Sequence, residues 1–515
     1  MKGDGVKGVF RGIVDSILAG EIETEAQLDA RKREAASLLG LDGLPGNATI
    51  LGCATMEERE RLHLLVRKPT RTLSGVAVIA AMTSPAPCPH GVCVPCPGGV
   101  CENTPQSYTG REPAAMRGFQ HRWDPYDQVR ARLAQLEEIG HSVDKAELIV
   151  MGGTFSARPR GYRHWFVKRA LQAMNDHPGP ASQWMSFSAI ARANSSARVR
   201  NIGTTFETRP DCCGPRDIHS MLSLGGTKVE LGVQSVSDEI LERMRRGHAV
   251  ADSIEANRRL RNAGLKVGFH MMPGLPGSSR EDDRRCFKEL FDSPDLRPDY
   301  LKIYPTLVLA GTKLHRLYLK GEFEPLNDQD AAELISRIKE ILPPYVRLQR
   351  VQRDIPARLI VAGVKKSNLR QLAGDLLKRR GGSCSCIRCR EAGLRGVTSG
   401  EFAFKERSYM ACGAKEEFLS FEDEEGSLVG FLRLRLGDVA RIRELHVYGP
   451  LVPIGSRRGG WQHRGYGARL LQAAEEICVD AGYERLFVTS GIGARGYYEG
   501  LGYHLQEPYM EKSLG

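Results

Sequence analysis

Short apolar runs alternate with longer amphipathic stretches through the middle of this chain. Apolar residues at helical spacing predict helices, for example at 128–139 and 253–263, and short unbroken apolar runs predict buried strands. The predicted strands are 75–82, 147–151, 202–206, 227–233, 266–271, 300–304 and 346–350. Because these β–α units follow one another without hairpin signals, the pattern predicts a parallel sheet in a full or partial (β/α) barrel.

The two ends of the chain have other patterns. Residues 1–74 look helical and carry recurrent basic side chains, with glycine breaks near residues 42–46. After residue 396 the sequence predicts a smaller α/β domain. Its expected elements are strands at 427–435, 442–448 and 485–490 and a helix at 469–481.

Composition narrows the class of protein. With 515 residues, 56.9 kDa and 41% hydrophobic residues, the chain is long enough for about three domains. No signal-peptide pattern opens the sequence and no apolar run could span a bilayer, so we expect a cytoplasmic protein without membrane association. The 13 cysteines lie mostly in tight clusters, which in a reducing compartment favours metal ligation over disulfides. The net charge of +11 suits a polyanionic partner.

Three cysteines with C-x4-C-x2-C spacing, Cys88, Cys93 and Cys96, follow the first predicted strand. Thiolates are ligands for iron–sulfur clusters and for zinc. Three such ligands can hold a 4Fe–4S cluster and leave one iron open, as a radical S-adenosylmethionine (SAM) enzyme requires. The alternative is a zinc knuckle in which Cys101 supplies a fourth thiol.

A second group of thiols lies at 381–396, between the barrel and the last domain. Cys384, Cys386 and Cys389, which we call the linker cysteines, occur in a polar segment flanked by glycines. A segment with so few apolar residues gains order from a metal, so we predict a zinc site with an unidentified fourth ligand. Free thiols are the alternative.

A glycine-rich loop, Gln462 to Gly467, lies between a predicted strand and the helix at 469–481. Glycines at the start of a helix leave backbone N–H groups free to bind an anion, and the helix dipole adds to the attraction. The Q-x-x-G-x-G pattern at this position matches the pyrophosphate loop of GNAT-type acetyltransferases.

Longer motifs carry a resemblance over nearly all of residues 45–514. They are CPHGVCVPCPGG (88–99), QSYTGREPAAMR (106–117), GHSVDKAELIVMGGTF (140–155), FETRPD (206–211), ELGVQSV (230–236), RRGHAV (245–250), HMMPGLPG (270–277), LKIYPTLV (301–308), RVQRDIP (350–356) and RELHVYG (443–449). On these motifs the sequence resembles the catalytic subunit of Elongator, a tRNA uridine carboxymethylation enzyme that also occurs as a stand-alone protein in archaea and some bacteria.

The resemblance implies a domain order and a reaction. The expected domains are a basic helical tRNA-binding segment (1–74), a radical SAM barrel (75–380), a zinc-stapled linker (381–396) and a GNAT acetyl-CoA domain (397–515). The expected reaction starts with a 5′-deoxyadenosyl radical, formed from SAM at a 4Fe–4S cluster. A hydrogen atom is then taken from the methyl group of acetyl-CoA, and the carbon radical adds to carbon 5 of a wobble uridine. Thioester hydrolysis leaves 5-carboxymethyluridine.

The resemblance also assigns roles to residues. Lys145, Tyr497 and Tyr498 are the expected catalytic residues, with Lys145 and Tyr498 also contacting acetyl-CoA. The residues expected to face SAM are Gly152, Gly153, Thr154, Glu230 and Gln234. Those expected to hold acetyl-CoA are Glu444, Leu445, His446, Val447, Gln462, Gly465, Tyr466, Gly467 and Ala468.

The expected partners are the anticodon stem-loop of tRNA, acetyl-CoA and an electron donor, and the oligomeric state is open, with a homodimer as the candidate. Basic side chains of the first segment and of 365–380 are expected to contact phosphates. A protein lysine acetyltransferase with a structural iron–sulfur barrel is the alternative function, since the GNAT motifs would serve both. A non-catalytic RNA-binding protein with two zinc sites ranks third, because it gives no reason for a coenzyme A loop.

Overall fold

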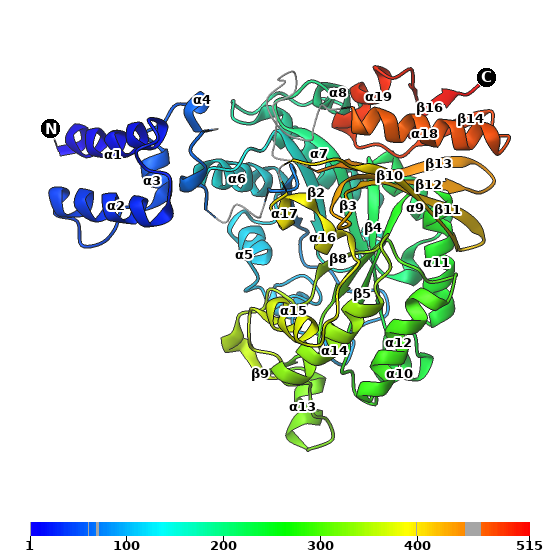
Figure 1. Ribbon diagram of the computed structural model, residues 1–515. Coiled ribbons are helices and arrows are strands. Elements are labelled where there is room, and N and C mark those ends of the chain that lie inside the picture. Colours follow the sequence, from blue (N-terminus) through cyan, green and yellow to red (C-terminus); the bar gives the residue numbers. More distant parts are fainter. Residues whose placement is uncertain (1, 60, 68–71, 398, 449–464) are drawn as a thin grey trace.

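Three bodies follow one another along the chain in the computed structural model (Figure 1). The structure describes residues 2–59, 61–67, 72–397, 399–448 and 465–515. None of the described helices is long and apolar enough to cross a membrane. Figure 1 shows the first helices at one side of the barrel, next to α6 (Pro125–Glu138).

The N-terminal body is helical, as expected, and has a small apolar core. Its helices are α1 (Lys2–Leu18), α2 (Glu25–Leu39), α3 (Asn47–Leu51) and α4 (Met56–Arg59). Helix α2 begins at a capping box of Thr24 and Gln27 and ends at Gly40, whose φ of 60° is the left-handed conformation that glycine adopts freely. Buried apolar residues of α1, α2 and α3 form the core that holds these helices together.

The central body is a seven-stranded parallel sheet, and all seven strands expected from the sequence are present. They are β1 (Ala77–Met82), β2 (Lys145–Met151), β3 (Arg200–Thr208), β4 (Gly226–Gln234), β5 (Lys266–Met271), β6 (Tyr300–Ile303) and β8 (Arg347–Arg350). The order β1-β2-β3-β4-β5-β6-β8 leaves β1 and β8 as edges, so the barrel is partial. A small antiparallel pair, β7 (Val308–Leu309) with β9 (Ile360–Ala362), lies outside this sheet.

Helices follow the strands as β–α units and cover the outside of the sheet. Those after α6 are α7 (Arg160–Asp176), α8 (Phe187–Asn194), α9 (Pro215–Ser223), α10 (Asp238–Arg243), α11 (Val250–Asn262), α12 (Arg280–Asp292), α13 (Lys313–Leu319), α14 (Asp328–Ile341) and α15 (Leu369–Arg379), and α5 (Pro113–Gln120) precedes α6. The main apolar core lies between strands and helices, where residues such as Val150, Phe166 and Leu231 are fully buried.

The C-terminal body is a second seven-stranded sheet with helix α18 (Tyr466–Asp480) packed on it. Its strands are β10 (Ala403–Ala411), β11 (Ala414–Glu422), β12 (Leu428–Leu436), β13 (Ala440–Val447), β14 (Arg485–Val488), β15 (His504–Gln506) and β16 (Tyr509–Ser513). Two short helices, α16 (Ile387–Arg390) and α17 (Ala392–Arg395), connect it to the barrel, and α19 (Arg495–Glu499) precedes β15. The sequence predicted β12, β13, α18 and β14 but none of the other four strands.

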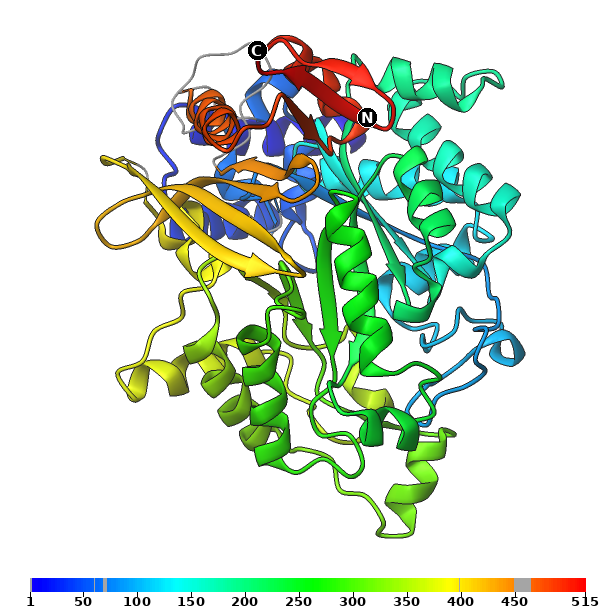
Figure 2. The same cartoon turned by 90° about the vertical axis from the view of Figure 1, so that its right-hand side faces the viewer.

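This second sheet lies at the N-terminal ends of the barrel strands. Both views show it, coloured yellow to red, above one end of the barrel (Figures 1 and 2). The contact is close: a Cβ atom on Gly491 would lie 2.2 Å from the backbone of Ile202 in β3, and one on Gly493 would lie 2.7 Å from Cβ of Arg200. The opposite end of the barrel, where the strands end, is therefore left for the loops that carry the cysteine motif.

Candidate active site

A large cavity of about 1100 Å³ opens at the C-terminal ends of the barrel strands. Active sites of (β/α) barrels occupy this end, because loops after successive strands meet there. Cys88, Cys93 and Cys96 all line the cavity, together with Gly153 from the end of β2 and Gln234 from the end of β4. The structure thus brings the three predicted iron ligands to one wall of one cavity.

Polar groups surround the three thiols. Gln106 Nε2 donates a hydrogen bond to Cys96 Sγ at 3.0 Å, and Ser107 Oγ lies 3.1 Å from the same sulfur. Arg246 Nη1 donates to Cys93 Sγ at 3.2 Å while its Nη2 donates to the carbonyl of Gly232. Donors and a guanidinium aimed at sulfur suit thiolate ligands, whose negative charge they stabilise.

The spacing of these thiols favours a cluster over a single ion. The sulfur atoms of the linker cysteines lie within 4.8 Å of one another, and the described residues contain no such group that includes Cys88, Cys93 and Cys96. One zinc ion at about 2.3 Å from each sulfur needs closely spaced ligands. Cys101, the fourth thiol of the zinc alternative, is exposed and does not line the cavity. The residues present therefore fit a 4Fe–4S cluster.

The glycine pair after β2, Gly152 and Gly153, lies at the cavity, and Gly153 lines it. Gly152 and Gly153 have φ values of 129° and 97°, which side-chain-bearing residues rarely adopt. A Cβ atom on Gly152 would lie 2.0 Å from Thr83 Oγ1, and one on Gly153 would lie 3.3 Å from the carbonyl of Gln106 and 3.9 Å from Cys88 Sγ. Thr154 Oγ1 lies 3.5 Å from the same sulfur. The absence of side chains leaves backbone at the cavity surface beside the thiols.

Charged side chains fill the interior of the barrel below the cavity, where ordinary barrels are packed with aliphatic residues. Glu230 of β4 is 1% exposed and forms an ion pair with Lys302 of β6. Its other oxygen lies 3.6 Å from Lys228 Nζ, and His270 Nε2 lies 2.9 Å from Glu230 Oε2. Glu207 of β3 accepts a hydrogen bond from Tyr108 at 2.7 Å. These contacts place Glu230 within a network instead of leaving it free.

The ligand atoms of Glu207, Glu230 and His270 lie within 4.8 Å of one another, as a metal site would require. Lys302 Nζ forms ion pairs with both carboxylates, at 3.8 Å from Glu207 Oε1. The ammonium group therefore supplies the positive charge that a metal ion would bring. We assign no metal to these residues.

The second sheet has an open strand edge of the kind that binds an extended ligand. Strand β13 pairs with β14 only from Ala440 to Ile442. Beyond that point, Glu444–Val447 pairs with β12 alone among the described strands, so one edge keeps free N–H and C=O groups. This edge contains four of the residues expected to bind acetyl-CoA. The Glu444 side chain is buried against the barrel, where it contacts Tyr300 and accepts a hydrogen bond from Arg433 Nε at 2.8 Å.

The start of α18 provides the other expected element of the acetyl-CoA site. Gly465 caps the helix with a φ of 82°, and Tyr466, Gly467 and Ala468 form its first turn, with N–H groups that have no partner within the helix. Gln462 lies outside the described residues. The Tyr497 hydroxyl faces this turn, since a Cβ atom on Gly467 would lie 2.7 Å from it.

The two expected catalytic tyrosines differ in environment. Tyr497 is 47% exposed, whereas Tyr498 is 6% exposed and packs edge to face on Tyr503. Burial raises the pKa of the Tyr498 hydroxyl, with Tyr497 and Glu444 adding to the shift, so this group stays protonated at neutral pH. Tyr498 is thus a buried proton donor, and Tyr497 is an accessible one.

Lys145 begins β2, at the end of the barrel that the second sheet covers. It pairs in the ladder with Arg200, whose Cβ is close to Gly493. Burial and Arg200 lower the pKa of Lys145. Lys145 therefore lies on the side of the second sheet, and Cys88, Cys93 and Cys96 lie at the opposite end of the same strands.

The linker cysteines come together at the start of α16. Their sulfur atoms lie within 4.8 Å of one another, and no fourth His, Cys, Asp or Glu of the described chain joins that group. Cys386 is fully buried, and the backbone N–H of the next residue, Ile387, donates to Val346 at 2.9 Å. The thiols thus lie where the linker meets β8, in a geometry that suits one tetrahedral ion with an additional ligand.

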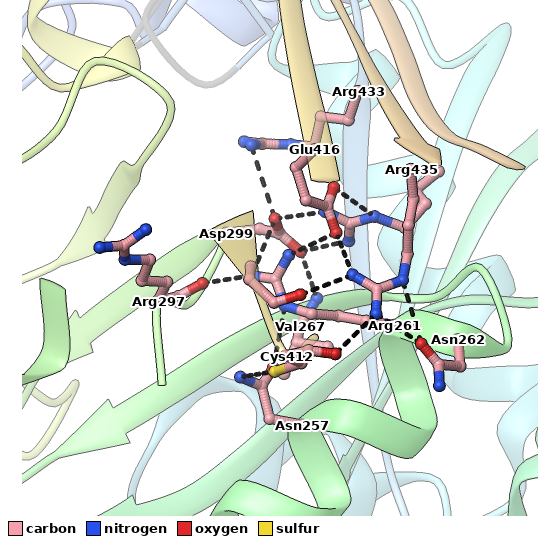
Figure 3. A network of polar contacts seen from close by, with 12 residues as sticks. Asn257, Arg261, Asn262, Val267, Arg297, Asp299, Cys412, Glu416, Arg433 and Arg435 are labelled. Atoms are coloured by element: carbon pink, nitrogen blue, oxygen red, sulfur yellow. Dashed lines mark hydrogen bonds and ion pairs between the residues drawn. The ribbon is translucent and has the colours of Figure 1, made fainter. Parts of the chain in front are cut away.

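Figure 3 shows a buried ionic network at the junction of the barrel and the second sheet. Asp299, just before β6, accepts hydrogen bonds from Arg443 Nη1 at 2.7 Å and Nη2 at 2.8 Å. Glu416 of β11 accepts from Arg443 Nη2 at 2.7 Å, and Arg261 of α11 contacts both carboxylates at 3.0 and 3.3 Å. All four side chains are 0% exposed. The β12–β13 ladder skips Arg443, which frees its side chain to reach the barrel.

The basic residues expected to contact phosphates divide into two groups. Arg33, Lys365, Lys366, Lys378 and Arg379 are exposed. Lys32 is 11% exposed and donates to Asn47 Oδ1, and Arg370 donates to the carbonyl groups of Leu348 and Gln349. Arg380 is paired with Glu333 and Glu340. Lys68 and Arg71 lie outside the described residues. The exposed residues can contact phosphates as predicted, whereas the Arg370 side chain points toward the barrel.

Sequence reasoning assigned no role to several residues that the structure places in the site. Gln106, Ser107 and Arg246 contact the cysteine sulfurs, and His270 contacts Glu230. Each belongs to a motif that carried the family resemblance, and that was the only signal available. The ionic partners Asp299 and Glu416 had no such signal, because an isolated acidic residue is usually exposed.

Models of four protein families match the chain. The ELP3 N-terminal domain matches residues 7–73 and the Radical SAM superfamily matches 88–290. A Radical SAM C-terminal domain matches 298–379, and the Acetyltransferase (GNAT) family matches 397–503. The barrel is therefore a radical SAM domain, and the second sheet with α18 is a GNAT domain.

Full-length relatives match as well. A tRNA uridine(34) acetyltransferase of Methanocaldococcus infernus is 47% identical over 92% of this chain and 92% of its own length. Elongator complex protein 3 of Homo sapiens is 40% identical over 97% of this chain and 95% of its own length. A solved structure of the archaeal Methanocaldococcus infernus Elp3 with an N-terminal deletion (1–46) has a TM-score of 0.75 at 43% identity, and the match covers 86% of this chain and 100% of that chain. The chain belongs to the family of the tRNA uridine(34) acetyltransferases and Elongator complex protein 3.

Proposed function

We propose that this protein converts a wobble uridine of tRNA to 5-carboxymethyluridine, using SAM and acetyl-CoA. The observation that carries the proposal is the presence of two different candidate sites in one chain. One is a cavity with three thiols and a glycine pair, and the other is an open β-strand edge with a glycine-capped helix. A simple acetyl transfer has no use for the first site, and SAM cleavage alone has no use for the second.

We assign SAM to the C-terminal end of the barrel and the coenzyme A part of acetyl-CoA to the other end, so the acetyl group would have to move into the cavity for hydrogen transfer. Cys88, Cys93 and Cys96 would hold a 4Fe–4S cluster, which would supply the electron for the cleavage of SAM to a 5′-deoxyadenosyl radical. Gln106 and Arg246 hold the thiolates through hydrogen bonds, and the backbone at Gly153 leaves room for the methionyl end of SAM.

At the other end, the free edge of β13 would hydrogen-bond the pantetheine arm of acetyl-CoA, and the first turn of α18 would hold the pyrophosphate. Lys145 approaches from the barrel. Tyr498, whose raised pKa keeps it protonated, would donate a hydrogen bond to the departing thiolate during thioester hydrolysis.

The protein lysine acetyltransferase of the alternative hypothesis receives less support from the contacts. Glu444, in the middle of the expected acetyl-CoA strand, is 7% exposed and is held by Tyr300 of the barrel. A peptide substrate would have to approach a GNAT face that the barrel partly covers. The proposal also includes the anticodon stem-loop of tRNA as substrate, an external electron donor and a zinc ion at the linker cysteines. It includes a cytoplasmic location, and a homodimer is the candidate oligomeric state.

The test compares two cysteine variants in anaerobically reconstituted protein supplied with tRNA, SAM, acetyl-CoA and a reductant. We expect Cys93→Ala to abolish both 5′-deoxyadenosine and carboxymethyluridine in nucleoside mass spectrometry. Cys101→Ala is the matched control, since this thiol is exposed and outside the cavity. Wild-type protein that leaves tRNA unmodified but acetylates protein lysines would overturn the proposal.

A further inference from the structure

The cavity wall contains a histidine held in a defined orientation by a buried carboxylate. His270, near the end of β5, lines the cavity, and its side chain is 15% exposed. Its Nε2 lies 2.9 Å from Glu230 Oε2, and Glu230 is 1% exposed. Because an ionised carboxylate only accepts hydrogen bonds, Nε2 carries a proton, and in the neutral ring Nδ1 is the nitrogen with the lone pair. This arrangement fixes the orientation of the imidazole ring in the cavity wall.

Neighbouring groups keep Glu230 ionised and fixed. Lys302 forms an ion pair with the same oxygen that faces His270, and Lys228 Nζ lies 3.6 Å from the other oxygen. With its amide turned so that the oxygen accepts from Lys228 Nζ, Gln349 also donates a hydrogen bond to Glu230 Oε1 at 3.2 Å. Burial by itself would raise the pKa of Glu230, but Lys302, His270 and Lys228 together hold it well below its usual range. Glu230 can therefore orient the imidazole and stabilise its protonated form.

Charged side chains lie close to this pair. Contacts of 4 Å or less join three carboxylates to two ammonium groups beneath the cavity. The carboxylates are those of Glu147, Glu207 and Glu230, and the ammonium groups are those of Lys228 and Lys302. Arg350, which lines the cavity nearby, is paired with Asp354 at 2.5 Å. These contacts hold the Glu230 carboxylate in place beside the imidazole.

The proposed reaction needs a base in this cavity. When the carbon radical adds to carbon 5 of the uridine, that carbon holds both the new substituent and its original hydrogen, and the unpaired electron is on carbon 6. The double bond of the ring is restored only if carbon 5 loses a proton and the ring loses one electron. Loss of the proton leaves the two electrons of the C–H bond on carbon 5, beside the unpaired electron on carbon 6. When one of these three electrons is removed, the other two form the double bond between carbon 5 and carbon 6.

We propose that His270 is the catalytic base that takes the proton from carbon 5 of the uridine, through Nδ1. Glu230 and Lys302 are positioning residues that set the tautomer and orientation of the imidazole. The electron would leave to a one-electron oxidant, which an oxidised iron–sulfur cluster held by Cys88, Cys93 and Cys96 would supply. The inference rests on the proposed function, and it adds a residue that acts after the carbon–carbon bond forms.

The test separates the steps before and after carbon–carbon bond formation. We expect His270→Gln to form 5′-deoxyadenosine at close to the wild-type amount while carboxymethyluridine falls by about 100-fold, the scale of general-base catalysis. The stalled ring radical should instead be reduced, giving a 5,6-dihydro nucleoside two mass units heavier. The exposed His219 of α9 provides the matched control, and His219→Gln should behave as wild type.

A second measurement requires no turnover. Nitrogen-15 spectra of the histidine rings in cluster-free protein should show His270 protonated at Nε2, and Glu230→Gln should change that signal. Wild-type carboxymethyluridine from His270→Gln, or an equal loss of 5′-deoxyadenosine without the heavier nucleoside, would overturn the assignment. Wild-type protein that forms no carboxymethyluridine would overturn the proposed function and this inference with it.

Discussion

Replacing Asp299 by asparagine tests whether the network of Figure 3 joins the two catalytic domains. The carboxylate binds Arg443 through both oxygens, at 2.7 and 2.8 Å, and lies 3.3 Å from Arg261 and 3.6 Å from Arg433. All of these groups are at most 1% exposed, so water cannot replace the lost charge. Removing one partner of a buried ion pair costs about 3–5 kcal/mol of unfolding free energy.

The assay is urea unfolding of cluster-free protein, followed by circular dichroism. Because the network links α11 and β6 of the barrel to β11, β12 and β13 of the GNAT domain, we expect Asp299→Asn to split a shared transition into two. Glu239→Gln is the control, since its exposed pair with Arg243 should contribute less than about 1 kcal/mol. An Asp299→Asn variant as stable as this control would refute the reasoning.

Four further outcomes are expected. Gly153→Ala should weaken SAM-dependent 5′-deoxyadenosine formation, because its φ of 97° and the carbonyl of Gln106 at 3.3 Å oppose a Cβ atom, whereas Gly161→Ala, with open space around it, should not. Replacing all three linker cysteines by serine should remove zinc measured by mass spectrometry and lower the melting temperature; unchanged values would mean free thiols. Charge reversal of Arg33, Lys365 and Lys366 should weaken tRNA binding. It should also reduce the slope of the logarithm of the binding constant against the logarithm of the salt concentration by about one unit per lost phosphate contact. Unchanged affinity would mean that the tRNA binds elsewhere. Burial would raise the pKa of Glu444, but Lys266, Arg433 and hydrogen bonds outweigh it and lower this pKa from 4.5 to about 2. The ionised carboxylate therefore stabilises the folded protein above pH 4.5, and this stabilisation is lost as the pH falls toward 2. A Glu444→Gln variant whose stability falls with acid as much as that of the wild type would contradict this.

The hydrophobic pattern predicted the barrel well because its strands are apolar toward the outer helices. β2 and β4 illustrate this, since Leu148, Val150 and Leu231 are fully buried and lie in short apolar runs. The interior face of the same strands carries Glu147 and Glu230, which the pattern could not distinguish from exposed positions. Their burial depends on pairing with lysines from other strands, and sequence spacing does not show such pairs.

The hairpin of β10 and β11 shows the same limit in the GNAT domain. Charged residues recur through both strands, and this pattern is typical of an exposed loop. Glu416 and Glu417 are nevertheless at most 1% exposed, because Glu416 pairs with arginines at the domain junction and Glu417 accepts from Ser408. Buried ion pairs thus hid β11 and the junction itself, while the motifs alone pointed to the thiols, the glycine pair and β13.

The most direct test of the central claim follows isotopes from acetyl-CoA. Protein, tRNA, SAM and a reductant are incubated without oxygen with acetyl-CoA labelled by deuterium in the methyl group and by carbon-13 at both acetyl carbons. If both domains act on one acetyl group, 5′-deoxyadenosine gains one deuterium and the wobble nucleoside gains two carbon-13 atoms. Carbon-13 found in protein lysines, with no deuterium in 5′-deoxyadenosine and an unlabelled nucleoside, would contradict the account.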